Sequence, residues 1–177
     1  MRLSKRAGNI VALDELVREV GKDAVRFNML TRRAEAQFAF DIALAKAQTE
    51  DNPVFYVQYA HARICAILRR AEEAGAPIVA PDAAALERLT APEEAELVAK
   101  LADWPEVVAE AASRLEPHRI ANYAMELAAA FHAFYHQHRV IVEDEALAAA
   151  RLVLVRAVKH VLAEALGLAG VDAPERM

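Results

Sequence analysis

Two tyrosines and an arginine at helical spacing are the residues of this sequence best suited to binding chemistry. Tyr56, Tyr59 and Arg63 stand at positions i, i+3 and i+7, so an α-helix places them on one side. Aromatic rings and guanidinium planes stack on unpaired nucleic-acid bases, and a guanidinium also contacts phosphate. The same tyrosines could instead pack against a neighbouring helix with their hydroxyl groups in water. Periodicity alone leaves both interpretations open.

Further residues of the same types extend this pattern. Arg70 follows Arg63 by two helical turns and so falls on the same face. Tyr135 and Arg139 form a second tyrosine–arginine pair, at i and i+4. The chain ends in Met177, whose flexible thioether suits packing beneath a base or ring, although chain ends are more often frayed.

Three histidines raise the possibility of a metal site. His132 and His136 have i, i+4 spacing, and His138 follows. A zinc site needs a tetrahedral ligand set, and here no cysteine is near and no glutamate follows at H-E-x-x-H spacing. We therefore predict no metal and interpret the histidines as a solvated, weakly cationic patch facing RNA.

Other reactive or charged side chains have simpler interpretations. Cys65 falls on or near the apolar side of its helix and is expected to be an inert buried thiol. Trp104, directly before a proline, is expected to be a packing anchor at a helix end. Glu93, Glu94 and Glu96 are expected to form a solvated face.

The elements that must position these residues are all predicted to be helices. Strand-type alternation is hard to find, and Ala, Leu, Val, Glu and Arg dominate a chain of 177 residues with only five glycines. Start and stop signals predict helices over residues 13–20, 23–33, 53–73, 117–138 and 143–166, with a short helix from residue 41. Thr90 to Glu93 matches a capping box for a helix that Pro105 is expected to break.

Charge is unevenly distributed along the chain. The formal net charge is -5, and residues 82–116 hold nine acids and three bases, so the remainder carries +1. The acidic excess thus leaves room for a basic face elsewhere, with modest and salt-sensitive affinity for a polyanion. A single cysteine, no signal peptide and no long apolar run predict a cytoplasmic protein without a membrane partner.

Several stretches together resemble one family of RNA-binding enzymes. Residues 3–9, L-S-K-R-A-G-N, resemble the K-M-S-K-S loop of class I aminoacyl-tRNA synthetases, and residues 19–26, E-V-G-K-D-A-V-R, resemble the D-A-L-R signature of an anticodon-binding domain. Residues 51–63, 131–140 and 167–177 are similar to later helices and the closing residues of bacterial arginyl-tRNA synthetases. Order and spacing match over essentially the whole chain.

This resemblance implies a catalytic role for the first residues. In the family, the second lysine of the loop, here Lys5, neutralises ATP phosphates during amino-acid activation, and Ser4 belongs to the same motif. ATP with Mg is therefore the cofactor expected in the full-length enzyme, and none is expected for this chain. No Rossmann catalytic domain or H-I-G-H-type motif is found here, so the chain is interpreted as a C-terminal fragment that is inactive alone.

The resemblance also implies the fold, the partner and the binding residues. The expected fold is an all-α helical bundle over residues 51–177, preceded by a catalytic-loop remnant at 1–12 and a short-helix connector at 13–50. The expected partners are arginine tRNA and the missing N-terminal and catalytic domains, with no DNA, in a monomer. The residues expected to contact tRNA are Tyr56, Tyr59, Arg63, Arg70, Tyr135, Arg139 and Met177, the last through a tail folded against the helix that carries Tyr135.

Two alternatives stay open at this point. One is a helical protein-interaction module without an RNA role. The other is a standalone tRNA-binding paralogue that never had a catalytic domain.

Overall fold

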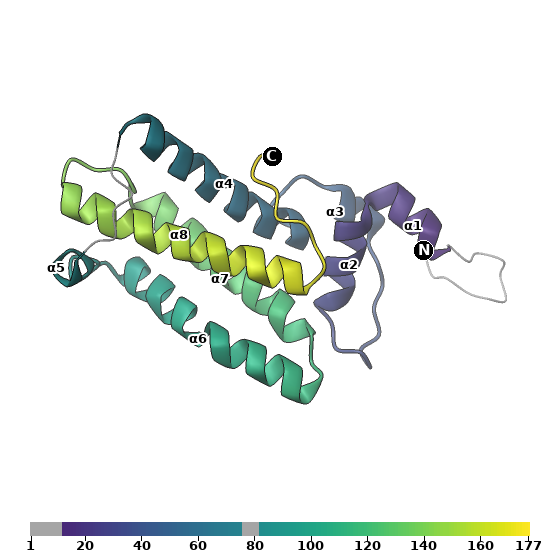
Figure 1. The fold of residues 1–177 in the computed structure, drawn as a ribbon. Coiled ribbons are helices and arrows are strands. Elements are labelled where there is room, and N and C mark those ends of the chain that lie inside the picture. Colours follow the sequence, from purple (N-terminus) through teal and green to yellow (C-terminus); the bar gives the residue numbers. More distant parts are fainter. Residues whose placement is uncertain (1–11, 76–81) are drawn as a thin grey trace.

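The computed structural model describes residues 12–75 and 82–177, which form eight helices and, within these ranges, no strand (Figure 1). The helices are α1 (Leu13–Val20), α2 (Lys22–Leu30), α3 (Ile42–Lys46), α4 (Pro53–Glu73), α5 (Ala83–Leu86), α6 (Pro92–Arg114), α7 (His118–Gln137) and α8 (Glu145–Leu168). The all-α prediction is confirmed. In the described ranges no helix combines the length and the apolar character needed to cross a membrane.

Side-chain caps explain where several of these helices begin. Asp41, Asp82 and Asp144 each accept a hydrogen bond from a backbone N–H three residues further on. Asn52 acts differently, because its Nδ2 donates to the carbonyl oxygens of Ala45 and Ala47 at 3.1 and 2.7 Å. The residue before Pro53 therefore connects α3 to α4 instead of capping α4.

Helix α6 corrects two of the sequence predictions. It continues through Pro105, and its N-terminal cap residue is Ala91 rather than Thr90, with the Glu94 carboxylate accepting from the Ala91 N–H at 2.9 Å. An interior proline costs about 3 kcal/mol. Packing against α7 and α8 compensates for this, because Trp104 before the proline and Ala111 after it are both buried.

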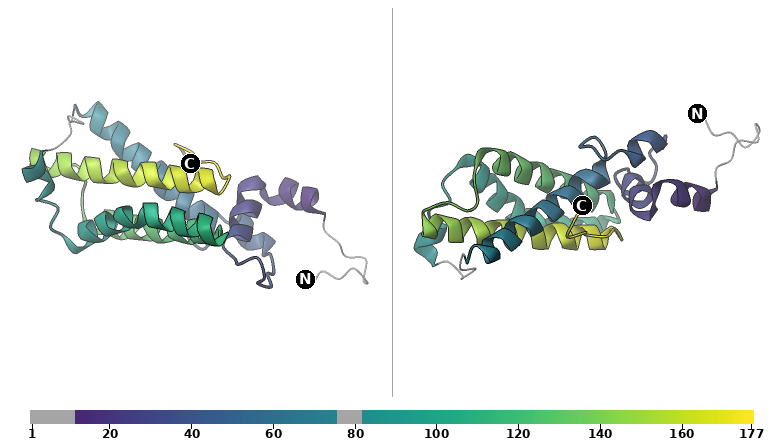
Figure 2. Two further views of the ribbon diagram at one scale, coloured as in Figure 1. Left: turned by 60° about the horizontal axis from the view of Figure 1, so that its bottom comes forward. Right: turned by 90° about the horizontal axis from the view of Figure 1, so that it is seen from above.

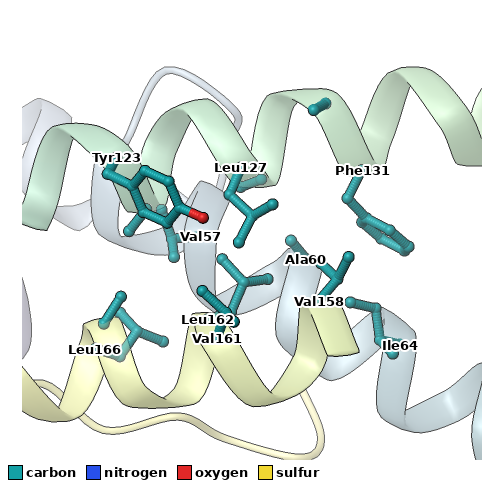
Figure 3. Packing of buried hydrophobic residues seen from close by; sticks show 14 of the residues in the cluster. Val57, Ala60, Ile64, Tyr123, Leu127, Phe131, Val158, Val161, Leu162 and Leu166 are labelled. Atoms are coloured by element: carbon teal, nitrogen blue, oxygen red, sulfur yellow. The ribbon is translucent and has the colours of Figure 1, made fainter. Parts of the chain in front are cut away.

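The long helices form a bundle with α7 and α8 at its centre. Helix α4 packs on one side of this pair and α6 on the other, and in the described ranges α4 and α6 do not touch (Figures 1 and 2). Fully buried side chains from three helices meet between α4, α7 and α8, among them Val57, Ile64, Leu127, Phe131 and Leu162 (Figure 3). Each contributes about 1.5–3 kcal/mol by leaving water.

The first three helices, α1 to α3, attach to one end of this bundle, and the short helix α5 packs on α8 at the other end (Figure 1). Helix α2 packs on α4 and α7, and its Phe27 is fully buried in the same core. The division proposed at residue 50 remains a prediction, and the structure shows that residues on both of its sides share one core.

Glu94 overturns the expectation of a solvated acidic face. Its side chain is buried, and Oε1 accepts from Arg151 Nε at 2.7 Å. Arg151 also donates to the carbonyl oxygen of Arg139 at 2.7 Å. A buried charge needs such a partner, and the partner lies 57 positions away, so local sequence could not identify it.

Candidate nucleic-acid interface

Helices α4 and α7 together present the predicted binding residues. Val57, Ala60 and Ile64 are buried in the core, whereas Tyr59 and Arg63 lie on the partly exposed side of α4. The two α4 tyrosines are half-buried, which lies between the two interpretations that their spacing left open. The tyrosines and the arginine therefore form one surface of α4, on which each side chain is partly packed and partly exposed.

Arg63 connects the aromatic residues of the two helices. Its Cζ lies 4.5 Å from the ring centroid of Tyr59 and 5.0 Å from that of Tyr135. Its guanidinium also donates to the Tyr59 hydroxyl. A guanidinium held over two rings is a preorganised, positively charged stacking surface.

Phe55 extends this stack and was not predicted as a site residue. Its ring is stacked on that of Tyr59, with 5.8 Å between centroids and 9° between planes. The signal was present in the sequence, since Phe55 and Tyr59 are four residues apart and an i, i+4 aromatic pair meets on a helix.

His132 and Tyr56 form the inner wall of the surface. The His132 ring lies 4.7 Å from that of Tyr56 and 6.0 Å from that of Tyr59. Burial lowers the pKa of His132 and raises the pKa of Tyr56. His132 is therefore a neutral, packed ring at pH 7, which corrects its interpretation as part of a solvated cationic patch.

Three neighbouring grooves run along this surface. The first, of about 840 Å³, is lined by Tyr56, Tyr59, Arg63, Tyr135 and other residues. The second, of about 490 Å³, shares Tyr135 and adds Arg70 and Arg139. The third, of about 740 Å³, shares Phe55 and Tyr59 with the first and adds Met177. Tertiary packing thus gathers all seven residues predicted to contact tRNA onto adjoining grooves.

The C-terminal tail is docked, but on a different helix from the one predicted. His61 Nδ1 of α4 lies 2.9 Å from the Pro174 carbonyl oxygen, and Lys159 of α8 pairs with Glu175 at 3.2 Å. The expected contact with α7 is replaced by contacts with α2, α4 and α8, and the tail crosses α4 (Figures 1 and 2). The reason is that polar partners for the tail backbone lie on these helices, including Gln58.

Three arginines of the α4–α7 surface carry positive charge without a nearby carboxylate among the described residues. In the two described ranges, Arg63, Arg70 and Arg139 have no carboxylate within 4.0 Å. One acid, Glu50, also lines the first groove. The acidic helix α6 lies on the far side of α7 and α8, so its repulsion of a polyanion is partly screened at this distance.

The remaining histidines have individual environments. His138 Nε2 lies 2.9 Å from Glu93 Oε2, whose pKa this hydrogen bond lowers. His136 is exposed and lines the first and second grooves. Across the part of the chain that the structure describes, no three His, Cys, Asp or Glu side chains are placed to hold a metal ion.

For two other residues the prediction of burial is confirmed, but Trp104 does not lie at a helix end, because α6 continues through Pro105. Cys65 is a free, buried thiol. Trp104 is buried, with its indole N–H donating to Glu164 Oε2 at 3.0 Å. The predicted catalytic residues Ser4 and Lys5 lie outside the described residues, so their role remains a prediction.

Comparisons with known proteins agree on one family. The model of the DALR anticodon binding domain matches residues 57–177. The whole chain is 54% identical to arginine–tRNA ligase of Desulforamulus reducens, covering 32% of that protein. It is 53% identical to arginine–tRNA ligase of Anaeromyxobacter sp. strain Fw109-5, covering 30%.

A solved structure adds the fold. Thermus thermophilus arginyl-tRNA synthetase superposes on 98% of this chain with a TM-score of 0.76 and 34% identity, and 29% of its own length is covered. The chain thus spans about a third of the length of the proteins it matches. With an all-α bundle, a matching family model and matching sequences over its full length, this chain belongs to the DALR anticodon binding domain family.

Proposed function

We propose that this chain binds the anticodon stem and loop of arginine tRNA on the α4–α7 surface, as part of an arginine–tRNA ligase. The observation that carries the proposal is the placement of Arg63 over the rings of both Tyr59 and Tyr135, at the edge of the first groove. Unpaired loop bases are the RNA elements that such aromatic and guanidinium planes bind. The family match supplies the choice of an anticodon loop over other single strands.

The proposed roles of the seven residues differ. Tyr59, Arg63 and Tyr135 provide stacking surface for loop bases. Arg70 and Arg139 are exposed and contact phosphates, which positions the RNA without reading its sequence. Tyr56, packed on His132, holds the wall of the groove, and Met177 contacts a base from the third groove.

The activity of the whole enzyme belongs to the same proposal. Its reaction is the ATP-dependent ligation of arginine to arginine tRNA, with Lys5 and Ser4 contributing to the site that binds ATP phosphates and Mg. Positioning of ATP supplies much of the rate of such a reaction. We therefore expect this chain alone to show no arginine-dependent ATP–pyrophosphate exchange above the level of a Lys5→Ala control.

A binding titration tests the proposal directly. An arginine-tRNA anticodon stem-loop is titrated with the wild-type chain and Arg63→Ala, with Arg114→Ala on α6 as the matched control. We expect Arg63→Ala to weaken binding by about 1–3 kcal/mol, the range for a lost stacking contact, and Arg114→Ala to leave it unchanged. Absence of salt-sensitive RNA binding by the wild-type chain would contradict the proposal and favour a protein-interaction module.

A further inference from the structure

The D-A-V-R segment of α2 contacts the end of the chain. Its apolar members, Ala24 and Val25, are buried, which leaves its two charged residues to face other elements. Arg26 Nε donates to the Ala169 carbonyl oxygen at 2.9 Å, and Ala169 is the C-terminal cap residue of α8. This contact fixes the point where the tail leaves the bundle.

Gly170 shows how tightly Arg26 fits there. Its φ of +66° lies in the left-handed region, and a Cβ added to it would stand 2.5 Å from Arg26 Nε. The guanidinium thus occupies the space that a side chain at residue 170 would need. The motif arginine and this glycine form one close contact across 144 positions of sequence.

Asp23, the first residue of the motif, binds the tail at Asp172, three residues after the Ala169 carbonyl that Arg26 contacts. Its Oδ2 accepts from the Asp172 N–H at 3.3 Å and from Gln58 Nε2 at 2.9 Å. Gln58 Nε2 also donates to the Asp172 carbonyl oxygen at 2.9 Å. Lys22 pairs with the Asp172 carboxylate at 2.9 Å. Both backbone groups of residue 172 are therefore held by α2 and α4.

After Asp172, the tail continues to the third groove. Pro174 is held at His61, and Glu175 at Lys159. Met177 then lines the same groove as Tyr59, and Tyr59 follows Gln58 directly in α4. The motif aspartate thus contacts the tail directly, and through Gln58 it is connected to the part of α4 that carries the stacking tyrosine.

We infer that Asp23 and Arg26 are positioning residues for RNA binding, which hold the C-terminal tail so that Met177 lines the groove beside Tyr59. The inference rests on the proposed function. It assigns the motif no contact with RNA, because its charged groups are engaged by the tail and by α4. The motif acts instead by fixing the tail before RNA arrives, which reduces the ordering that binding requires.

Two measurements on the 177-residue chain test this role. The first is hydrogen exchange of the Asp172 amide, and the second is affinity for the arginine-tRNA anticodon stem-loop. Asp23→Ala and Arg26→Met are compared with Asp14→Ala, an exposed acid of α1, and thermal melting confirms that each variant is folded. We expect both motif variants to speed exchange at Asp172 by at least about tenfold and to weaken RNA binding by about fivefold.

Deletion of Met177 separates positioning from general stability. In that background, Asp23→Ala should have no further effect on RNA affinity, because the residue that it positions is gone, whereas a purely structural role predicts an additive loss. Faster exchange with unchanged RNA affinity would overturn the inference and leave the proposed function intact. Unchanged exchange in both variants would overturn it as well, and lack of RNA binding by the wild-type chain would overturn the proposed function with it.

Discussion

The two outer sides of the bundle use arginine and glutamate in opposite ways. On the α6 side, the basic residues are paired, as in Lys100 with Glu126 and Arg119 with Glu110. On the α4–α7 side, Arg63 and Arg139 have no carboxylate partner within the described ranges. Paired charges support the fold and cancel at a distance, whereas unpaired ones remain available to a polyanion. The net charge of the chain therefore says little about what either side binds.

The same contrast extends to how each side is held. The α6 side contains the buried pair between Glu94 and Arg151, while the α4–α7 side is built from packed rings around His132. The two sides of the bundle are connected, because Arg151, which pairs with Glu94, also donates a hydrogen bond to the carbonyl oxygen of Arg139. We expect substitutions on the α6 side to change mainly stability, and those on the α4–α7 side to change mainly RNA binding.

The largest expected effect is on stability and comes from Glu94→Ala. Removing one partner of a buried ion pair costs about 3–5 kcal/mol, because the other charge stays buried and unpaired. Glu126→Ala, which breaks a surface pair, should cost less than about 1 kcal/mol. Urea denaturation measures both, and equal losses for the two variants would show that Glu94 is not the buried anchor of this side.

A smaller effect, now on binding, is expected from Tyr59→Ala. Losing a stacked aromatic weakens RNA binding by about 1–3 kcal/mol. Val98→Ala removes an exposed apolar side chain from α6 and serves as the control. The comparison fails if Tyr59→Ala binds the anticodon stem-loop as tightly as Val98→Ala, or if Tyr59→Ala unfolds the chain because its ring belongs to the core.

The two exposed arginines of the second groove should change salt dependence. For single-stranded nucleic acid, each lost phosphate contact reduces the slope of log K against log salt by about 0.7. Arg70→Ala and Arg139→Ala are each expected to show this reduction, and Arg114→Ala on α6 is not. Titrations at several salt concentrations measure the slopes, and identical slopes for all three variants would remove phosphate contact from the roles of Arg70 and Arg139.

The smallest effect concerns pH. Burial lowers the pKa of His61 and His132 below that of an unfolded histidine. The unfolded chain then binds more protons, so the free energy of unfolding decreases as pH falls from about 7.5 to about 5.5, through the ordinary histidine range. His132→Gln should reduce this dependence, because it removes one of the two imidazoles whose pKa is lowered by burial. Urea denaturation at about pH 7.5 and about pH 5.5 measures the free energy of unfolding. If His132→Gln does not change how this free energy depends on pH, the lowered pKa of His132 is contradicted.

The sequence by itself determined the helices and the types of residue at the site. Caps and prolines at Asp41, Pro53 and Asp144 are local signals, because each acts on backbone groups within one turn. The i, i+3, i+7 spacing also placed Tyr56, Tyr59 and Arg63 on one side of α4. Family resemblance in the motifs then predicted the all-α bundle and the family.

Only the tertiary structure decided how these residues divide their roles. Tyr56 and Tyr59 are one helical turn apart on the same side of α4, but the ring of His132 on α7 lies closer to that of Tyr56, 4.7 Å against 6.0 Å, so Tyr56 is packed as the wall of the groove. Pro105 remained in a helix because packing on both sides exceeded its local cost.

The longest-range contacts were the least predictable. Arg151 reaches Glu94 across 57 positions, and Asp23 reaches the Asp172 N–H across 149. Neither residue carries a local signal for its partner, because hydrogen bonds between distant segments depend on how helices pack and not on residue spacing. Helical periodicity therefore fixed which face each side chain occupies, and packing of the helices fixed what that face meets.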